Sequence, residues 1–251
     1  MMVEKLEGNM AIDVRNVSKT YRVRPATNRT LKDIFIHHDG KKTEYRKILH
    51  DISFSVKRGE ALGIVGRNGS GKSTMLKLLT RIMEPDSGSI QMNGRTASLL
   101  ELGAGFHPDM TGRENVYINA SIYGFKKKDI DVKLNDIIEF SELGDHIDDP
   151  VRIYSSGMYM RLAFSVSINM DADIILIDEI LAVGDEAFKA KCLNTLKEMK
   201  KNGAAIVLVS HSMSQIQSVC DEVIWLENGR MREIGECNTV CGNYTESMKK
   251  I

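Results

Sequence analysis

The sequence predicts an α/β fold built on a parallel sheet, and three of its features support that class. Continuous apolar runs at 61–65, 174–177 and 204–209 are typical of strands buried on both faces. A charged helical pattern at 185–201 separates the last two runs, as expected for a crossover helix between parallel strands. A glycine-rich loop after the first run leads directly into another helical pattern.

Two further stretches predict strands outside that parallel set. Residues 10–21 and 48–59 alternate apolar and polar side chains, which is the pattern of half-buried strands. Residues 221–235 predict a hairpin, because Asn228 and Gly229 provide the residue types that a tight two-residue turn prefers.

Between 103 and 170 the apolar spacing becomes helical. Thr111 and Glu114 have the spacing of a capping box, in which a threonine at the start of a helix and an acid three residues later bond each other's backbone. Residues 129–143 repeat apolar side chains at intervals of three and four. We therefore expect a mostly helical insert within the α/β core.

Composition excludes several classes of function. Lys plus Arg and Asp plus Glu both number 34, so no overall charge favours nucleic acid or an anionic membrane. No apolar run is long enough to span a bilayer. The chain has only 4 cysteines, which suits reduced thiols.

The strongest chemical signal is the sequence GRNGSGKST, which matches the pattern G-x(4)-G-K-[ST] between a strand and a helix. Glycines let backbone N–H groups surround phosphates, Lys72 reaches the β and γ phosphates, and Ser73 holds Mg²⁺. We therefore predict a nucleoside triphosphate site with Mg²⁺. Its residues are Gly66, Arg67, Asn68, Gly69, Ser70, Gly71, Lys72, Ser73 and Thr74.

Polar residues at the ends of two apolar runs predict the catalytic part of this site. Asp178 follows one run and is placed to hold Mg²⁺ through a water of the ion, while Glu179 is the candidate to orient and polarise the attacking water. His211 follows the neighbouring run and is placed to contact the γ-phosphate. The alternative for both acids is a strand that simply ends in solvated carboxylates.

A second glycine- and serine-containing segment, YSSG at 154–157, precedes another helical pattern. Ser155 or Ser156 could cap that helix and do nothing more. The same residues could instead offer a helix N-terminus to an anion. The residues alone leave both interpretations open.

In this order, the motifs resemble those of the nucleotide-binding subunits of ABC transporters. The resemblance extends from about Ala11 to Gly235. It implies a P-loop NTPase fold of the ABC ATPase type, with a RecA-like core, an antiparallel β subdomain and an inserted helical subdomain. It also implies that ATP is the nucleotide, that Tyr21 stacks on adenine, that 154–158 is the signature segment, and that Asp185 belongs to the D-loop.

Departures from the general family pattern narrow the resemblance to one subfamily. The usual signature is Leu-Ser-Gly-Gly-Gln. Here Tyr154 replaces the leucine, Ser156 replaces a glycine and Met158 replaces the glutamine. Glu101 is the nearest polar residue to the usual Q-loop glutamine, and it is a candidate contact for the metal or for water. With YSSGMYMRLAFSV and DEILAVGD, these features resemble the ATPase subunits of exporters for O-antigen, teichoic acid and related polysaccharides.

The resemblance implies a mechanism and partners. Two copies would dock head to tail, so that Ser155, Ser156 and Gly157 of one copy face the ATP held by the other. The pair would drive an integral membrane permease that moves a lipid-linked polysaccharide, and it would lie at the cytoplasmic face of the membrane. Nucleic acid is not expected as a partner. The ATPase subunit of an ABC importer, or of another ABC exporter, is the alternative.

The resemblance also sets expected boundaries. The nucleotide-binding domain is expected at 10–235 and its helical subdomain at about 103–170. Residues 236–251 would form a short C-terminal extension, too short for the β-sandwich that some members of the subfamily carry there.

Two stretches keep alternative interpretations. The basic stretch 22–47 is expected to be an insertion, either near the membrane face or as a solvated surface segment. Residues 102–107, with an exposed Phe106, are expected to receive the permease's coupling helix, or else to form only a loop and a turn.

Overall fold

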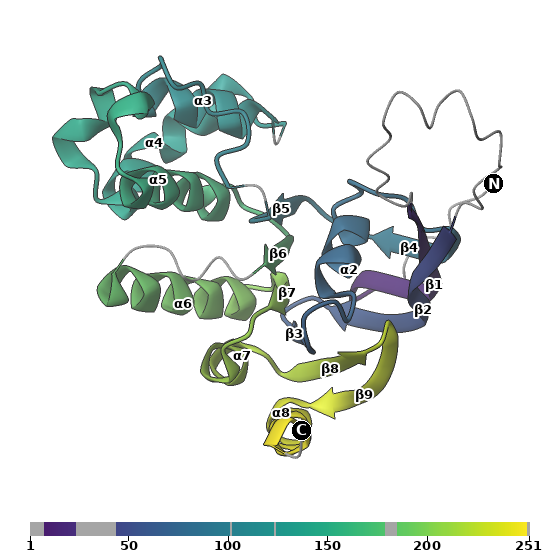
Figure 1. The fold of residues 1–251 in the computed structure, drawn as a ribbon. Helices are drawn as coiled ribbons and strands as arrows, with labels where there is room; N and C mark the ends of the chain where they lie inside the picture. Colours follow the sequence, from purple (N-terminus) through teal and green to yellow (C-terminus); the bar gives the residue numbers. More distant parts are fainter. Residues whose placement is uncertain (1–7, 24–43, 101, 123, 179–184, 250–251) are drawn as a thin grey trace, which may run out of the picture.

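The computed structural model describes residues 8–23, 44–100, 102–122, 124–178 and 185–249. Figure 1 shows an α/β core at the centre, an antiparallel sheet to its right and a group of helices at its upper left. The α/β class, the antiparallel sheet and the helical insert predicted from the sequence are all present.

The core sheet has six strands, and each neighbouring pair is parallel except the last. In spatial order the strands are β5 (Thr96–Ser98), β6 (Ile174–Asp178), β7 (Ala205–Val209), β3 (Ala61–Val65), β8 (Glu222–Glu227) and β9 (Arg230–Glu236). The predicted hairpin is confirmed, because β8 and β9 pair antiparallel around a turn in which Asn228 and Gly229 have positive φ.

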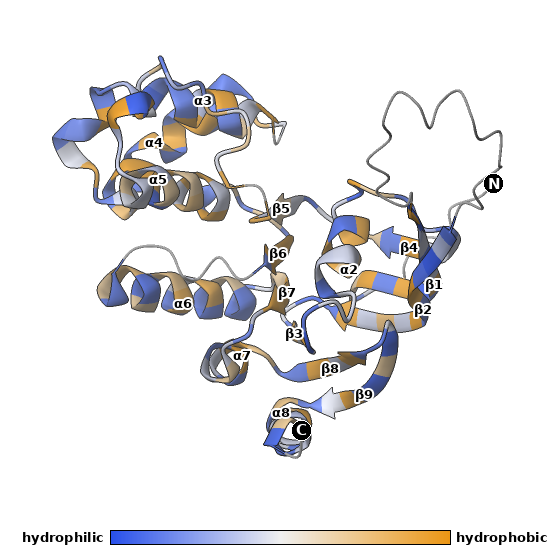
Figure 2. Ribbon diagram, in the orientation of Figure 1, coloured by the Kyte–Doolittle hydropathy of each residue, from blue (hydrophilic) through white to orange (hydrophobic). Residues whose placement is uncertain are grey.

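Alternate residues of β3 pack on opposite faces of this sheet. Leu62 and Ile64 join the cluster that contains helix α2 (Lys72–Leu79) and the antiparallel sheet. Ala61 and Val65 join the cluster on the other face, which includes residues of α5, α6, α7 and α8. In Figure 2 the strands β6 and β7 are coloured mostly as hydrophobic, as predicted for strands covered on both faces.

Four helices contribute to that second face. They are α5 (Ser156–Asn169), the crossover helix α6 (Glu186–Lys201), α7 (Met213–Val219) and the C-terminal α8 (Cys237–Lys249). Within the described residues, no helix is both long and apolar enough to cross a membrane.

The antiparallel sheet has the order β2-β1-β4, with β1 (Met10–Val23), β2 (Glu44–Lys57) and β4 (Ser87–Met92). Strands β1 and β2 pair as far as Val23 and Glu44. The ends of the predicted insertion at 22–47 are therefore strand residues, while 24–43 lie outside the described residues. The sequence did not reveal these ends because the paired residues there are mostly exposed and polar, so they lack the alternating pattern.

The helical insert consists of α3 (Gly112–Ile122), α4 (Lys127–Ser141) and the start of α5, with short 3₁₀ turns between α4 and α5. The capping box is confirmed, because the Thr111 N–H donates to Glu114 Oε2 at 2.8 Å and the Glu114 N–H donates to Thr111 Oγ1 at 3.1 Å. The expectation of an exposed Phe106 is wrong. This ring is half-buried and meets Tyr159 edge-on at 5.1 Å.

Helix α5 belongs to both the insert and the core. Leu162 and Val166 pack with α3 and α4, whereas Phe164 packs beneath the core sheet against Phe188 of α6. Both phenyl rings are buried. Because α5 packs on both sides, any shift of the insert must also shift this contact with the core.

We predict that Phe164→Ala lowers the free energy of unfolding by about 3 to 5 kcal/mol, since it removes a fully buried ring and leaves a cavity. Urea denaturation monitored by circular dichroism measures the loss. Val132→Ala on α4 is the control, since Val132 is 76% exposed and its truncation should change stability by no more than about 0.5 kcal/mol. Equal stability of the two variants would contradict the packing described here.

Candidate nucleotide-binding site

The loop between β3 and α2 can adopt its conformation only with glycine at two positions. Gly66 has φ of 153°, and a Cβ there would lie 2.3 Å from the carbonyl oxygen of Leu226. Gly71 has φ of 108°, and its Cβ would lie 2.6 Å from a methyl group of Leu49. Both contacts are far shorter than packing allows, so the glycines of the predicted loop have a structural cause.

Helix α2 begins as an open anion site. Its N-cap, Gly71, provides no side-chain hydrogen bond, and its first turn holds no acidic residue. The first N–H groups of a helix have no partner within the helix and carry partial positive charge. They therefore face the loop ready to bind a phosphate.

Two side chains reinforce this interpretation. Lys72 is 6% exposed, and its Nζ donates to the carbonyl oxygens of Gly66 and Arg67 at 2.8 and 3.2 Å. The ammonium group is thus held inside the loop. Ser70 Oγ is buried and has no hydrogen-bond partner in the described part of the chain. Such an atom is costly unless a ligand or water satisfies it.

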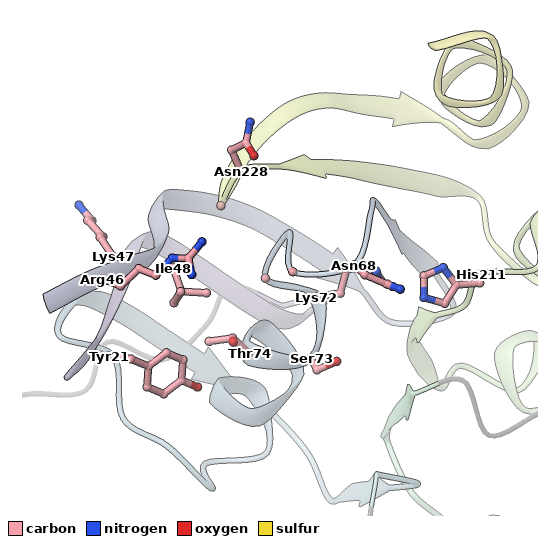
Figure 3. A pocket seen from close by; sticks show the side chains of 13 residues that line it. Tyr21, Arg46, Lys47, Ile48, Asn68, Lys72, Ser73, Thr74, His211 and Asn228 are labelled. Carbon is pink, nitrogen blue, oxygen red and sulfur yellow. The ribbon is translucent and has the colours of Figure 1, made fainter. Parts of the chain in front are cut away.

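A cavity of about 450 Å³ opens in front of the loop. Figure 3 shows its residues, with Tyr21 at one end and His211 at the other. The cavity is lined by Tyr21, Arg46, Lys47, Ile48, Asn68, Gly69, Gly71, Lys72, Ser73, Thr74, His211, Asn228 and Gly229. Six of the nine predicted loop residues therefore share one cavity with Tyr21 and His211, and the other three, Gly66, Arg67 and Ser70, do not line it. No sequence pattern indicated that Arg46, Lys47 or Ile48 would line this cavity.

Tyr21 lies at the end of the cavity remote from His211. Its hydroxyl group is 3.1 Å from the sulfur of Met83, which fixes the ring, and its strand neighbour across β1 and β2 is Arg46. The antiparallel sheet thus brings an aromatic side chain to a site whose phosphate loop comes from the core.

The residues at the ends of β6 and β7 lie next to each other, as predicted. Asp178 pairs in register with Val209, two residues before His211. Glu179 and Glu101 lie outside the described residues. Among the residues that are described, no group of three or more His, Cys, Asp or Glu side chains could hold a metal ion. Phosphate-bound Mg²⁺ usually needs only one or two protein oxygens, which the Ser73 hydroxyl and the Asp178 carboxylate fit.

The signature segment does not line this cavity. Ser155 is the N-cap of α5, and its Oγ accepts from the Met158 N–H at 3.2 Å, so Ser155 does cap this helix. Gly157, in contrast to Ser155, has no structural role in its own chain. A Cβ built there would meet only Ser155 Oγ, at 3.8 Å, and the backbone is helical. The fold of this chain gives no reason for a glycine at this position.

Tyr154, which stands in place of the usual leucine, fastens the signature segment to the helical insert. Its hydroxyl donates to the carbonyl oxygen of His146 at 2.6 Å. Burial, with smaller contributions from the negative charges of Asp149 and Asp148, raises the pKa of Tyr154 to about 12.

Asp185 begins α6, and its Oδ1 accepts from the Phe188 N–H at 2.9 Å. Its other oxygen accepts from Arg161 Nη2 at 2.8 Å. The hydrogen bond from the Phe188 N–H and the Arg161 charge hold the pKa of Asp185 below its usual value. Sequence reasoning missed Arg161, because a single arginine seven residues after Tyr154 carries no motif that reveals its partner.

Comparison with known families identifies the family of this chain. Residues 49–182, more than half of the chain, match the model of the ABC transporter family. The chain belongs to the ABC transporter family. It is an ABC ATPase, which binds ATP and couples ATP hydrolysis to transport.

Similar proteins agree with this ABC assignment. The O-antigen export system ATP-binding protein RfbB of Klebsiella pneumoniae is 47% identical over 94% of the chain and 98% of its own length. The teichoic acids export ATP-binding protein TagH of Listeria innocua is 39% identical over 96% of the chain and 71% of its own length.

A solved structure of a dimeric ATP-binding cassette with ADP and phosphate shares the fold of this ABC ATPase. It superimposes with a TM-score of 0.73 at 19% identity, over 90% of this chain and 98% of its own. The ABC ATPase cassette predicted from the motifs is therefore confirmed at the level of the fold.

We predict that Tyr154→Phe lowers the free energy of unfolding by about 1 kcal/mol, because it removes the hydrogen bond to His146. A tyrosine pKa raised on folding stabilises the protein below pH 10, and this contribution is lost as the pH rises toward 12. Urea denaturation at pH 8, 10 and 11 measures both effects. The variant should lose less stability than the wild type between pH 10 and 11, and identical pH dependence would contradict the assignment.

Proposed function

We propose that the chain is the ATP-hydrolysing subunit of an exporter that moves a lipid-linked cell-surface polysaccharide through a membrane permease. The similarity to the O-antigen export protein over nearly the full length of both chains carries this proposal. The similarity to the teichoic acid export protein supports the same class of cargo. The permease would hold the chain at the cytoplasmic face of the membrane.

Within the chain, we assign the loop 66–74 to the phosphates and Tyr21 to the adenine ring. The uncapped helix α2 and the enclosed Lys72 support the first assignment, and the position of Tyr21 at the far end of the cavity supports the second. Ser73 and Asp178 would hold Mg²⁺, with Glu101 as a further candidate ligand. Bound Mg²⁺ would neutralise charge on the β and γ phosphates.

Three residues would act on the γ-phosphate and the water. Glu179 would orient and polarise the attacking water, and His211 would donate to the γ-phosphate from the end of the cavity opposite Tyr21. Asp185 would complete the site from the partner copy.

The signature segment would complete the site of a second copy. Ser155, Ser156 and Gly157 lie outside the cavity of their own chain, yet they surround the N-terminus of α5. An exposed helix start and a glycine with open space above it suit the approach of a phosphate held by another molecule. Hydrolysis would then remove the charge that links the two copies.

The helical insert would connect this cycle to the permease. The loop at 102–107 lies beside α3 and α5, since Tyr159 donates to the Gly103 carbonyl oxygen at 2.9 Å and Asn119 donates to that of Ala104 at 2.7 Å. A coupling helix seated here would therefore act directly on α5, whose start carries the signature.

We predict that Lys72→Ala lowers ATP turnover by at least about 100-fold, because the loop loses the ammonium group nearest the phosphates. Phosphate release measures turnover in the purified protein. In the source organism, the same change should abolish the surface polysaccharide. Normal turnover would refute the site. Lost turnover with normal surface polysaccharide would refute the cargo, and co-purification with a solute-binding protein system would favour an importer.

Substitutions of Gly157 distinguish a role in folding from a role in ATP turnover. Gly157→Ala should leave the free energy of unfolding unchanged or raise it by up to about 1 kcal/mol, because alanine is the better helix former. Gly157→Asp should fold and bind ATP as a monomer, yet lose turnover, since a carboxylate would face the partner's phosphates. Thermal unfolding, nucleotide affinity and phosphate release test this. Normal turnover of Gly157→Asp would contradict the composite site.

A further inference from the structure

One arginine joins the two segments that would complete the partner's site. Arg161 lies on α5, one turn beyond Gly157, and its side chain is 19% exposed. One branch of its guanidinium group, Nη1, donates to Glu142 Oε2. The other, Nη2, donates to Asp185 Oδ2 at 2.8 Å. Two carboxylates from different segments thus hold the two branches of one planar group.

This contact is part of a longer chain of alternating charges. Glu142 also accepts, at Oε1, from Lys191 Nζ at 3.0 Å, so the order is Lys191, Glu142, Arg161, Asp185. Lys191 lies in α6, and Glu142 follows the end of α4 in a left-handed conformation. Both neighbouring positive charges hold the pKa of Glu142 below its usual value, with Lys191 the larger cause. This series of charges therefore links α4 and α5 to α6 at two positions, Lys191 and the N-cap Asp185.

A cluster of three phenylalanine rings packs against the positive side chains of Arg161 and Lys191. The guanidinium carbon of Arg161 lies 4.7 Å from the ring centroid of Phe188, and Lys191 Nζ lies 4.5 Å from that of Phe140. These rings contact each other and Phe164. A cation held over an aromatic face and bonded at both branches has little rotamer freedom left, unlike an ordinary surface ion pair.

We propose that Arg161 is a positioning residue that fixes the start of α5 relative to Asp185, so that the signature and Asp185 meet the second copy as one unit. Asp185 is already held to α6 by its cap, and Gly157 is already held in α5. Arg161 in addition fixes the positions of Asp185 and Gly157 relative to each other. The inference rests on the composite site proposed above.

Stability alone does not account for this arrangement. After Arg161→Met, Glu142 keeps Lys191 and Asp185 keeps the Phe188 N–H, so neither carboxylate loses every partner. The pairs are partly exposed, with side-chain exposures of 47% and 64% for the two acids, so solvent screening leaves each pair a small contribution to stability. Misplacing a reacting group by about 1 Å, in contrast, can cost 100-fold in rate.

The experiment compares ATP turnover of Arg161→Met, Arg161→Lys and the control Lys133→Met. Lys133 also joins the insert to the segment after α5, through Asp171 at 3.1 Å, but it touches neither the signature nor Asp185. Arg161→Met should lower kcat at least 10-fold while the KM for ATP and the monomer affinity change less than 2-fold. Arg161→Lys should recover part of kcat, because one ammonium group cannot span both carboxylates. A loss of kcat no greater than that of Lys133→Met would overturn the inference.

Asp185→Asn provides the second arm, because asparagine keeps the helix cap but loses the charge. If Arg161 acts through Asp185, the double variant should be no slower than the slower single variant. Losses that multiply would contradict this.

The third arm uses Glu179→Gln to trap the ATP-bound dimer, detected by size exclusion. Adding Arg161→Met should weaken dimerisation at least 10-fold. Equal dimerisation with and without Arg161→Met contradicts the inference alone. A Glu179→Gln protein that stays monomeric with Arg161 intact contradicts the composite site and the inference together.

Discussion

The start of α2 is the constraint on which the rest of the structure depends, because the first N–H groups of a helix have no partner within the helix and this start has no side-chain cap, so it can bind an anion. Gly66 and Gly71 allow the backbone to turn there, and Lys72 lies inside the turn. Strand β3, buried on both faces, fixes this loop at the edge of the sheet. The two sheets and the insert can then be understood by what each contributes around one phosphate group.

The parts of the fold contribute unequally to the nucleotide cavity of their own chain. The antiparallel sheet brings Tyr21 to one end of the cavity, and β7 brings His211 to the other. No described residue of the helical insert lines the cavity of its own chain, although the insert carries a helix N-terminus with an open glycine at Gly157. A site that is complete on one side only is consistent with a partner of the same sequence, which presents its insert to the open side.

The sequence predicted those parts of the fold for which the local residue pattern is compatible with only one structure. The phosphate loop follows from GRNGSGKST, and burial on both faces made β6 and β7 recognisable as apolar runs. Other features depend on residues that are distant in sequence. Phe106 is half-buried because Tyr159 lies beside it, and Arg161 acquires a role only because α4 and α6 place Glu142 and Asp185 on either side of it. No local pattern carries such information.

Mixing two inactive variants tests the central claim most directly. Lys72→Ala has an intact signature, and Gly157→Asp has an intact phosphate loop, so a mixed dimer contains one complete composite site and one doubly altered site. If pairing is random and the sites act independently, an equal mixture should recover about one quarter of wild-type ATP turnover. A mixture that stays as inactive as its two components would contradict a site shared between two copies.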